Sequence, residues 1–327
     1  MFTPLNLFLT VAAYFVFLGA CGRWAEKRAV QGKDPTRNGL VYALSLTVYC
    51  TSWTFFGSVG SAASNGMVFS TIYLGPTLMM FLAWGLIRRL IRLRKEYNIA
   101  SLADLLTQRY GQSLRLGMFI TLVLLLGMIP YVGLQLRAIV GSFTLLTGMK
   151  HNANTVWAGH YADEIFVVLI ALITCFFGLR RVDIHVRQTG LLAVLAVESV
   201  VKLLAFVAVG VFVVYGMFDG LGDLHARLLA QPALRQQLLV SSLTNTDYLN
   251  WVTYLLLSMG AVVLLPRMFH VVVVENDQER HLATAVWLFP LYLLIISFFV
   301  MPIAAAGLLL GYPASSADWF VIYLPRD

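Results

Sequence analysis

The sequence has few charged residues. They make up 12% of its 327 positions, whereas about 25% is usual for a soluble domain. Hydrophobic residues account for 59%, and the mean hydropathy is +0.79. A soluble fold of this size cannot bury that much apolar surface, and the apolar runs are continuous instead of alternating, which excludes a membrane β-barrel. We therefore expect an all-α integral membrane protein.

Cysteine is also rare, and Cys21, Cys50 and Cys175 show neither the spacing of a metal site nor that of a disulfide framework. The sequence has no P-loop, no HExxH or GxSxG motif and no kinase nucleotide-binding pattern, so we expect no enzyme within these residues. Because a motif for ATP hydrolysis is lacking, transport would depend on an ion gradient, and the expected cofactors are none beyond a coupling ion such as Na⁺. The N-terminus lacks a charged region before its apolar run, which indicates a retained first helix.

Apolar runs predict eight membrane spans. They cover residues 3–21, 39–62, 67–87, 116–147, 164–180, 189–217, 249–271 and 283–310. If every run crosses the membrane, seventeen Lys and Arg residues, Arg267 among them, fall in loops on one side and only three on the other. The positive-inside rule then places the N-terminus outside and the basic loops in the cytoplasm. The net charge of +7 is thereby explained as a topology signal, and no nucleic-acid partner is expected.

One predicted span is interrupted by small and polar residues, CTSWTFFGSVG at positions 50–60. Because backbone polar groups in hydrocarbon need partners, such a break is tolerated only where it faces protein or a water-filled cavity. Transporters use broken helices to present carbonyl groups to cations and N–H groups to anionic solutes. The alternative is a close-packed helix face, since Gly and Ser also allow helices to approach closely.

A second candidate break lies at 258–267, where Ser258 and Gly260 precede Pro266. It occurs five spans after the first break, in a helix that crosses the membrane in the opposite direction. This arrangement fits inverted-topology repeats. The alternative is an ordinary Gly/Pro kink. Ser101 and Asp104, in the connection before the fourth span, form a capping box that predicts a short helix there.

Polar side chains inside spans are a further signal of function. Glu198 and Lys202 lie four residues apart on one helix face, so they form either a structural ion pair or part of an ion route. Tyr131 and Gln135, next to Pro130 in the fourth span, are candidates to contact a solute.

Three stretches resemble the sodium/solute symporter family. They are FFGSVG (55–60), NIASLADLLTQRYG (98–111) and PYVGLQLRAI (130–139). A closer resemblance is to the transporter-like N-terminal domain of bacterial sensor histidine kinases of the CbrA type. It is carried by YALSLTVYCTSWTFFGSVGSAAS (42–64), IYLGPTL (72–78), VESVVKLLAF (197–206) and LLPRMFHVVVVEN (264–276). The resemblance extends over essentially the whole chain, 1–327, as one domain.

The resemblance implies a LeuT-like inverted-repeat fold: an extra N-terminal helix, the first five-helix repeat and the first two helices of the second. The chain is then expected to be the N-terminal part of a longer protein in the bacterial inner membrane. Matching the family's motif residue by residue implies sodium-binding carbonyl groups near Thr47 and Cys50. It also implies solute contacts, which fall at Thr51, Ser52 and Trp53 in the first break and at Ser258, Gly260 and Val262 in the second. The glycine pair reads GSVG here, where the family has GxPG.

These expectations combine into a membrane module that binds and imports a small solute, an amino acid by resemblance to the family, with sodium as the candidate coupling ion. It would serve as the sensory part of a sensor histidine kinase, with downstream kinase domains and a response regulator as partners. One alternative is a plain sodium/solute symporter without signalling. Another is a receptor or scaffold in the membrane that transports nothing.

Overall fold

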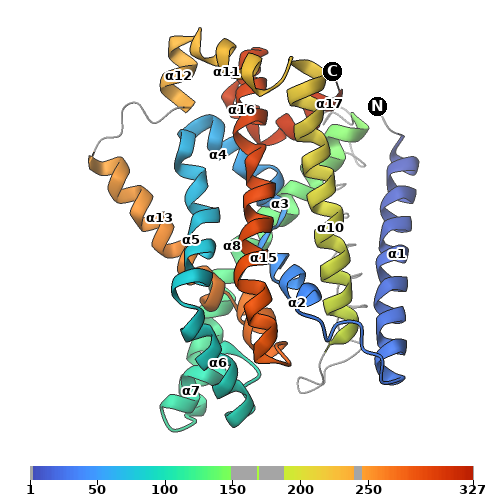
Figure 1. Cartoon of the computed structure of the whole chain (residues 1–327), viewed down its shortest axis with the longest axis vertical. Helices are drawn as coiled ribbons and strands as arrows, with labels where there is room; N and C mark the ends of the chain where they lie inside the picture. The colour runs from blue at the N-terminus through green and yellow to red at the C-terminus, as the bar shows by residue number, and fades with distance from the viewer. Residues whose placement is uncertain (1–2, 149–167, 169–187, 239–244, 327) are drawn as a thin grey trace.

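The computed structural model describes residues 3–148, 168, 188–238 and 245–326, and all regular secondary structure in these ranges is helical. The main α-helices, labelled in Figure 1, are α1 (Pro4–Val30), α2 (Gly39–Ser45), α3 (Ser52–Phe55), α4 (Gly57–Asn65), α5 (Thr71–Leu82), α6 (Trp84–Tyr97), α7 (Leu102–Arg109), α8 (Leu114–Thr147), α10 (Thr189–Phe212), α11 (Leu221–Leu229), α12 (Pro232–Leu238), α13 (Asn245–Leu264), α14 (Pro266–Phe269), α15 (Glu279–Phe298), α16 (Val300–Leu309) and α17 (Phe320–Arg326). Short 3₁₀ or π-helical turns join several of them, among them Leu46–Tyr49 after α2, Gly66–Ser70 before α5, Val213–Met217 after α10, His270–Val274 after α14 and Ala314–Trp319 before α17.

Several helices are long and apolar enough to cross a membrane. Within the described residues there are five, namely Leu5–Val30, Gly57–Leu82, Leu114–Thr147, Thr189–Met217 and Glu279–Leu309. A sixth span is formed if Tyr248–Leu264 and Pro266–Val274, which meet at a bend of 52°, are one broken helix. The expectation of an all-helical, multi-pass membrane protein is thus confirmed. The predicted span 164–180 lies outside the described residues.

The helices gather around a long central pair, α10 and α15, with α2 packed against both (Figure 1). Two buried tyrosines link these helices by donating hydrogen bonds to main-chain oxygens. Tyr42 Oη of α2 lies 2.7 Å from the carbonyl oxygen of Val272, in the turn after α14. Tyr292 Oη of α15 lies 2.9 Å from the carbonyl oxygen of Ser199 in α10. Each bond satisfies a polar group that would otherwise be buried without a partner. The core around these bonds is apolar and contains the fully buried Phe206, Phe269, Phe289 and Phe320.

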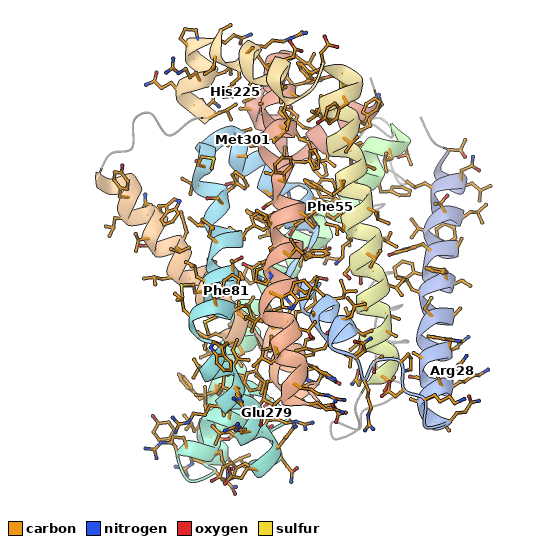
Figure 2. The ribbon with its side chains drawn as sticks, viewed as in Figure 1. Arg28, Phe55, Phe81, His225, Glu279 and Met301 are labelled. Atoms are coloured by element: carbon orange, nitrogen blue, oxygen red, sulfur yellow. The ribbon has the colours of Figure 1, made fainter. Side chains whose placement is uncertain are left out.

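The basic segments meet at one end of the molecule. Arg88 and Arg92 of α6 pair with Glu279 at the start of α15, at 2.8 Å and 2.9 Å. Arg37, before α2, pairs with Asp277 at 3.0 Å, and Figure 2 shows Arg28 and Glu279 toward this same end and His225 at the other. Three of the predicted basic loops therefore share one side of the bundle, as the distribution of Lys and Arg requires. The assignment of that side to the cytoplasm stays a prediction.

The predicted short helix after α6 is also present. It is α7, in which the Ser101 hydroxyl accepts a hydrogen bond from the main-chain N–H of Asp104 at 3.1 Å. The Asp104 carboxylate in turn accepts from the N–H of Ala100 at 3.1 Å. These two bonds satisfy N–H groups at the start of the helix, as a capping-box arrangement does.

Candidate functional site

The first predicted break lies at Cys50 and Thr51. The chain ends a 3₁₀ turn at Tyr49, passes through Cys50 (φ −78°, ψ 114°) and an extended Thr51 (φ −117°, ψ −167°), and resumes as α3 at Ser52. Two non-helical residues in succession interrupt the i to i−4 ladder and leave the Cys50 carbonyl open to another partner. The N–H of Cys50 still donates to the Thr47 carbonyl at 2.8 Å, and the Thr51 carbonyl accepts from the N–H of Thr54 at 3.0 Å. The interruption is therefore located in the first two residues of the predicted window.

The glycines of the same window have a different role. Gly57 and Gly60 belong to the regular helix α4. A Cβ on Gly60 would clash with a carboxylate oxygen of Asp318, in the turn that precedes α17. Close packing thus explains Gly60, whereas the break explains Cys50 and Thr51. A break and a close-packed helix face are thus both present in this window, at different residues.

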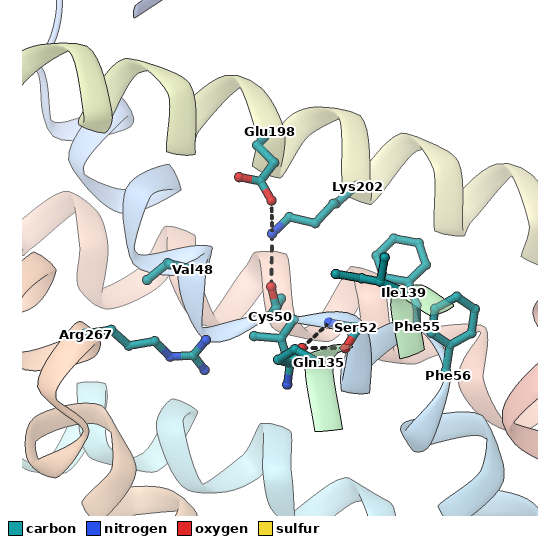
Figure 3. A pocket seen from close by; sticks show the side chains of 11 residues that line it. Val48, Cys50, Ser52, Phe55, Phe56, Gln135, Ile139, Glu198, Lys202 and Arg267 are labelled. Carbon is teal, nitrogen blue, oxygen red and sulfur yellow. Dashed lines mark hydrogen bonds and ion pairs between the residues drawn. The ribbon is translucent and has the colours of Figure 1, made fainter. Parts of the chain in front are cut away.

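A cavity of about 360 Å³ opens beside the break (Figure 3). Its wall contains residues from the broken segment, from α8, from α10 and from α14. They are Val48, Cys50, Thr51, Ser52, Phe55, Phe56, Gln135, Ile139, Glu198, Lys202 and Arg267. A volume of this size matches a small-solute pocket, and the wall combines apolar surface with a few polar and charged groups, as such pockets do. Six of the residues predicted from sequence to serve a site, Cys50, Thr51, Ser52, Gln135, Glu198 and Lys202, are brought together here.

The carbonyl group freed by the break is bound by an ammonium group. Lys202 Nζ, from α10, donates to the carbonyl oxygen of Cys50 at 3.0 Å, and Glu198 holds the same nitrogen with a carboxylate oxygen at 3.0 Å (Figure 3). Carbonyl and carboxylate oxygens are also the ligands that a hard cation prefers. The Cys50 carbonyl was predicted to bind sodium. In the structure it binds the ammonium of Lys202, which also contacts the carboxylate of Glu198.

A second contact ties the break to α8. The side-chain carbonyl oxygen of Gln135 accepts a hydrogen bond from the hydroxyl of Ser52 and a second from its main-chain N–H at 3.2 Å. That N–H is one of the first in α3 and has no partner within the helix. Gln135 thus acts as a cap supplied by a different span, and it fixes the position of α3 on one side of the cavity.

Arg267 enters the cavity from the second break. This break lies at Leu265, whose extended conformation (φ −71°, ψ 127°) precedes Pro266 at the start of α14. The Arg267 guanidinium lies 4.6 Å from the centre of the Tyr131 ring and donates to the carbonyl oxygen of Tyr49 at 3.4 Å. The assignment of Arg267 to a basic loop was wrong, because the bend after Leu264 turns this residue inward. An arginine directly after a proline in a predicted break was the signal that could have identified it.

The remaining predicted contacts lie off the cavity wall. Ser258 donates from Oγ to the carbonyl oxygen of Thr71 at 2.7 Å and serves the contact between α13 and α5, while Val262 is fully buried. A Cβ added at Gly260 would lie 3.5 Å from a methyl carbon of Leu264 in the same helix, which is an ordinary contact. Thr47 is buried and donates to the carbonyl oxygen of Leu44 at 2.6 Å.

Two further predicted residues stand at the edges of the site. The Trp53 ring lies over Gly57 of its own segment and does not line the cavity. Tyr131 reaches the site indirectly, through its contact with the Arg267 guanidinium. In the described part of the chain, no group of three or more His, Cys, Asp or Glu side chains is placed to hold a metal ion.

Comparison of the chain with protein-family models, with curated proteins and with solved structures found no match in any of the three. The fold and the hydropathy define the class, which is a helical protein with several membrane spans. Membership of the symporter family, the LeuT-like topology and the link to a histidine kinase stay predictions from the quoted stretches.

Proposed function

We propose that the protein binds a small solute, an amino acid, in the cavity beside Cys50 and Thr51, and that it acts as a transporter-like sensory module in the membrane. The observation that supports this most directly is the composition of the cavity wall, to which both broken segments contribute. Main-chain and side-chain groups at helix breaks are the usual solute ligands in transporters with inverted repeats. The choice of an amino acid and of a downstream kinase rests on the resemblance.

A solute in this cavity would touch elements that can move relative to one another. The first break joins the 3₁₀ turn that ends at Tyr49 to α3, and the second joins α13 to α14. A solute that binds one arrangement of these pieces more tightly than another shifts the population toward it. A kinase attached downstream could respond to that shift, which is limited by the difference between the two affinities.

We also propose that the solute binds without sodium. The position that a sodium ion would take between the Cys50 carbonyl and Glu198 is filled by the ammonium of Lys202. A plain sodium symporter, which is the alternative function, would need a second cation site elsewhere. Sodium-dependent uptake into proteoliposomes would favour that alternative.

The test is ligand-induced stabilisation of the full chain in lipid nanodiscs, measured as the thermal unfolding midpoint with each of the twenty standard L-amino acids in turn. A ligand at about 100 times its Kd stabilises a protein by about 2.7 kcal/mol, which is readily measured. Ile139→Trp adds a large ring on the α8 wall and should abolish the shift, and Thr253→Trp, at an exposed position of α13, should preserve it. The proposal fails if no amino acid raises the midpoint, or if Ile139→Trp leaves the shift unchanged.

A receptor that transports nothing would also bind in this assay. It is distinguished by uptake of the same radiolabelled amino acid into proteoliposomes, which the transporting form performs and the receptor does not. Kinase coupling is tested separately in the full-length parent protein by autophosphorylation with and without that amino acid.

A further inference from the structure

Arg267 is a cation on the cavity wall, and none of the described acidic residues is paired with it. In the described ranges no Asp or Glu oxygen lies within ion-pair distance of its guanidinium. Its polar contacts are the carbonyl oxygen of Tyr49 at 3.4 Å, which is long for a hydrogen bond, and the nearby hydroxyl of Tyr131. Its Nε is buried and has no hydrogen-bond partner among the described residues. A guanidinium is always charged, so within the described part of the chain this side chain carries both a charge without a counter-ion and an unused donor.

Among the described residues, three charged side chains line the cavity, and their sum is one positive charge, which belongs to Arg267. Glu198 and Lys202 pair with each other at 3.0 Å and so neutralise each other, and the second partner of Lys202 is the neutral carbonyl of Cys50. An unpaired charge within a membrane protein is costly, and such residues usually mark the path or the site of a solute. An anionic group entering the cavity would remove this cost.

The orientation of Arg267 suits a planar anion. The ring of Tyr131 packs on the guanidinium at 4.6 Å and limits the directions in which its N–H groups can donate. A guanidinium presents N–H donors as a rigid fork that matches the two oxygens of a carboxylate. Figure 3 shows the guanidinium of Arg267 extending toward Cys50, apart from the Glu198–Lys202 pair.

We infer that Arg267 binds the carboxylate group of the solute. The inference rests on the proposed binding of an amino acid and names the residue that recognises its carboxylate. The side chain of such a solute lies against the apolar part of the wall, which is formed by Phe55, Phe56 and Ile139. The site therefore selects acids over their neutral amides, because an amide offers one acceptor and no charge to the fork.

The experiment compares each of the twenty standard L-amino acids with its own α-carboxamide on the wild-type chain in nanodiscs. For the acid that stabilises the chain, we expect the amide to bind at least about tenfold more weakly, since the amide cannot form the charge-assisted hydrogen bonds that the carboxylate forms. This arm needs no variant, so it does not depend on whether a substituted chain folds. Equal binding of an acid and its amide would overturn the inference while leaving solute binding intact.

Variants provide the second arm. Arg267→Gln removes the charge and should lower the affinity for the acid about tenfold or more while leaving that for the amide unchanged. Arg267→Lys keeps the charge but loses the fork, so its affinity should be intermediate. Arg137→Gln is the matched control: it also removes an arginine from the membrane region, but from an exposed position of α8 outside the cavity wall, and it should bind as the wild type does.

The outcomes separate the two levels of the account. If no amino acid stabilises the wild-type chain, the proposed function fails and the inference fails with it. If an amino acid binds and Arg267→Gln binds it equally well, only the role of Arg267 is overturned. Loss of acid binding in Arg267→Gln, with amide binding kept, supports both.

Discussion

The ammonium nitrogen of Lys202 lies 3.0 Å from the carbonyl oxygen of Cys50. A side chain of α10 thus binds the main-chain oxygen that the first helix break exposes. The same nitrogen lies 3.0 Å from a carboxylate oxygen of Glu198. The ion pair of Glu198 and Lys202 is therefore part of the site and not a separate structural feature of α10. Because Lys202 occupies the place of a cation at the break, the effect of sodium on the unfolding midpoint tests how the break is stabilised.

Lys202→Ala is expected to create sensitivity to sodium. The substitution leaves the Cys50 carbonyl and the Glu198 carboxylate facing a gap, and oxygens of this kind bind hard cations. We expect the variant to be less stable than the wild type in choline chloride and to recover part of that loss in sodium chloride at equal ionic strength. The unfolding midpoint of the wild type should be the same in both salts.

The control is the double variant Glu198→Gln/Lys202→Ala, which removes the anionic ligand and should lose the sodium response. If sodium raises the unfolding midpoint of the wild type as much as that of Lys202→Ala, then Lys202 does not take the place of a sodium ion at the break.

Gln135→Ala is expected to loosen the first break. Gln135 is the partner of both the hydroxyl and the N–H of Ser52, and a typical hydrogen bond contributes about 0.5–1.5 kcal/mol to stability. We expect a loss of about 1–2 kcal/mol in the free energy of unfolding and faster hydrogen exchange at Ser52. Gln108→Ala in α7, where the side-chain amide bonds Gln112 at the surface, should change neither quantity. Unchanged exchange at Ser52 in Gln135→Ala would show that the cap does not hold α3.

Gly75→Ala is expected to disrupt the contact between α5 and α13. The added Cβ would clash with Ser258 Oγ and would lie 2.7 Å from the main-chain nitrogen of Met259, and the backbone cannot move aside as a side chain can. Overpacking of this kind costs about 1–3 kcal/mol or more. Gly85→Ala in α6 is the control, because nothing lies within 4 Å of the new atom and Ala favours a helix over Gly. Thermal unfolding should show a lower midpoint for Gly75→Ala alone.

The pair formed by Asp223 and Arg227 on α11 predicts a pH dependence. Arg227 donates to both carboxylate oxygens of Asp223 at 2.9 Å and so lowers the pKa of Asp223 below its usual value. A lowered pKa means that the pair stabilises the folded chain above the ordinary pKa of Asp and that this contribution is lost as the pH falls through the folded pKa. Arg227→Gln should therefore unfold at a slightly lower temperature than the wild type at neutral pH, and the gap should narrow in acid to the part that comes from the contact of Arg227 with the Phe218 ring. Arg235→Gln, in α12, should show no such gap at either pH.

The sequence predicted the break at 50–60 because hydroxyl groups and glycines are unusual within a span, but the pattern could not separate their roles. Cys50 and Thr51 form the break, whereas Gly60 allows close packing against Asp318, which is distant in sequence. Which neighbour approaches a glycine depends on tertiary structure and not on the local pattern. The predicted pair Glu198 and Lys202 was found as expected, since their spacing alone brings them together.

The second break lies inside the predicted window 258–267. The chain bends at Leu265, because the residue before a proline avoids the helical conformation, whereas Ser258 and Gly260 remain helical. Arg267 was assigned to a loop because basic residues near span ends usually report topology. The proline before Arg267 was a sign that the chain turns at this point. The direction that α14 takes after the bend, which brings this arginine to the cavity wall, depends on tertiary structure.

Solute binding at the first break is tested most sharply by a structure of the full chain in nanodiscs, determined with the stabilising amino acid bound. We expect density for that solute in the cavity beside Cys50 and Thr51, with its carboxylate against the guanidinium of Arg267. An empty cavity in a chain that binds the amino acid at another position would contradict the account.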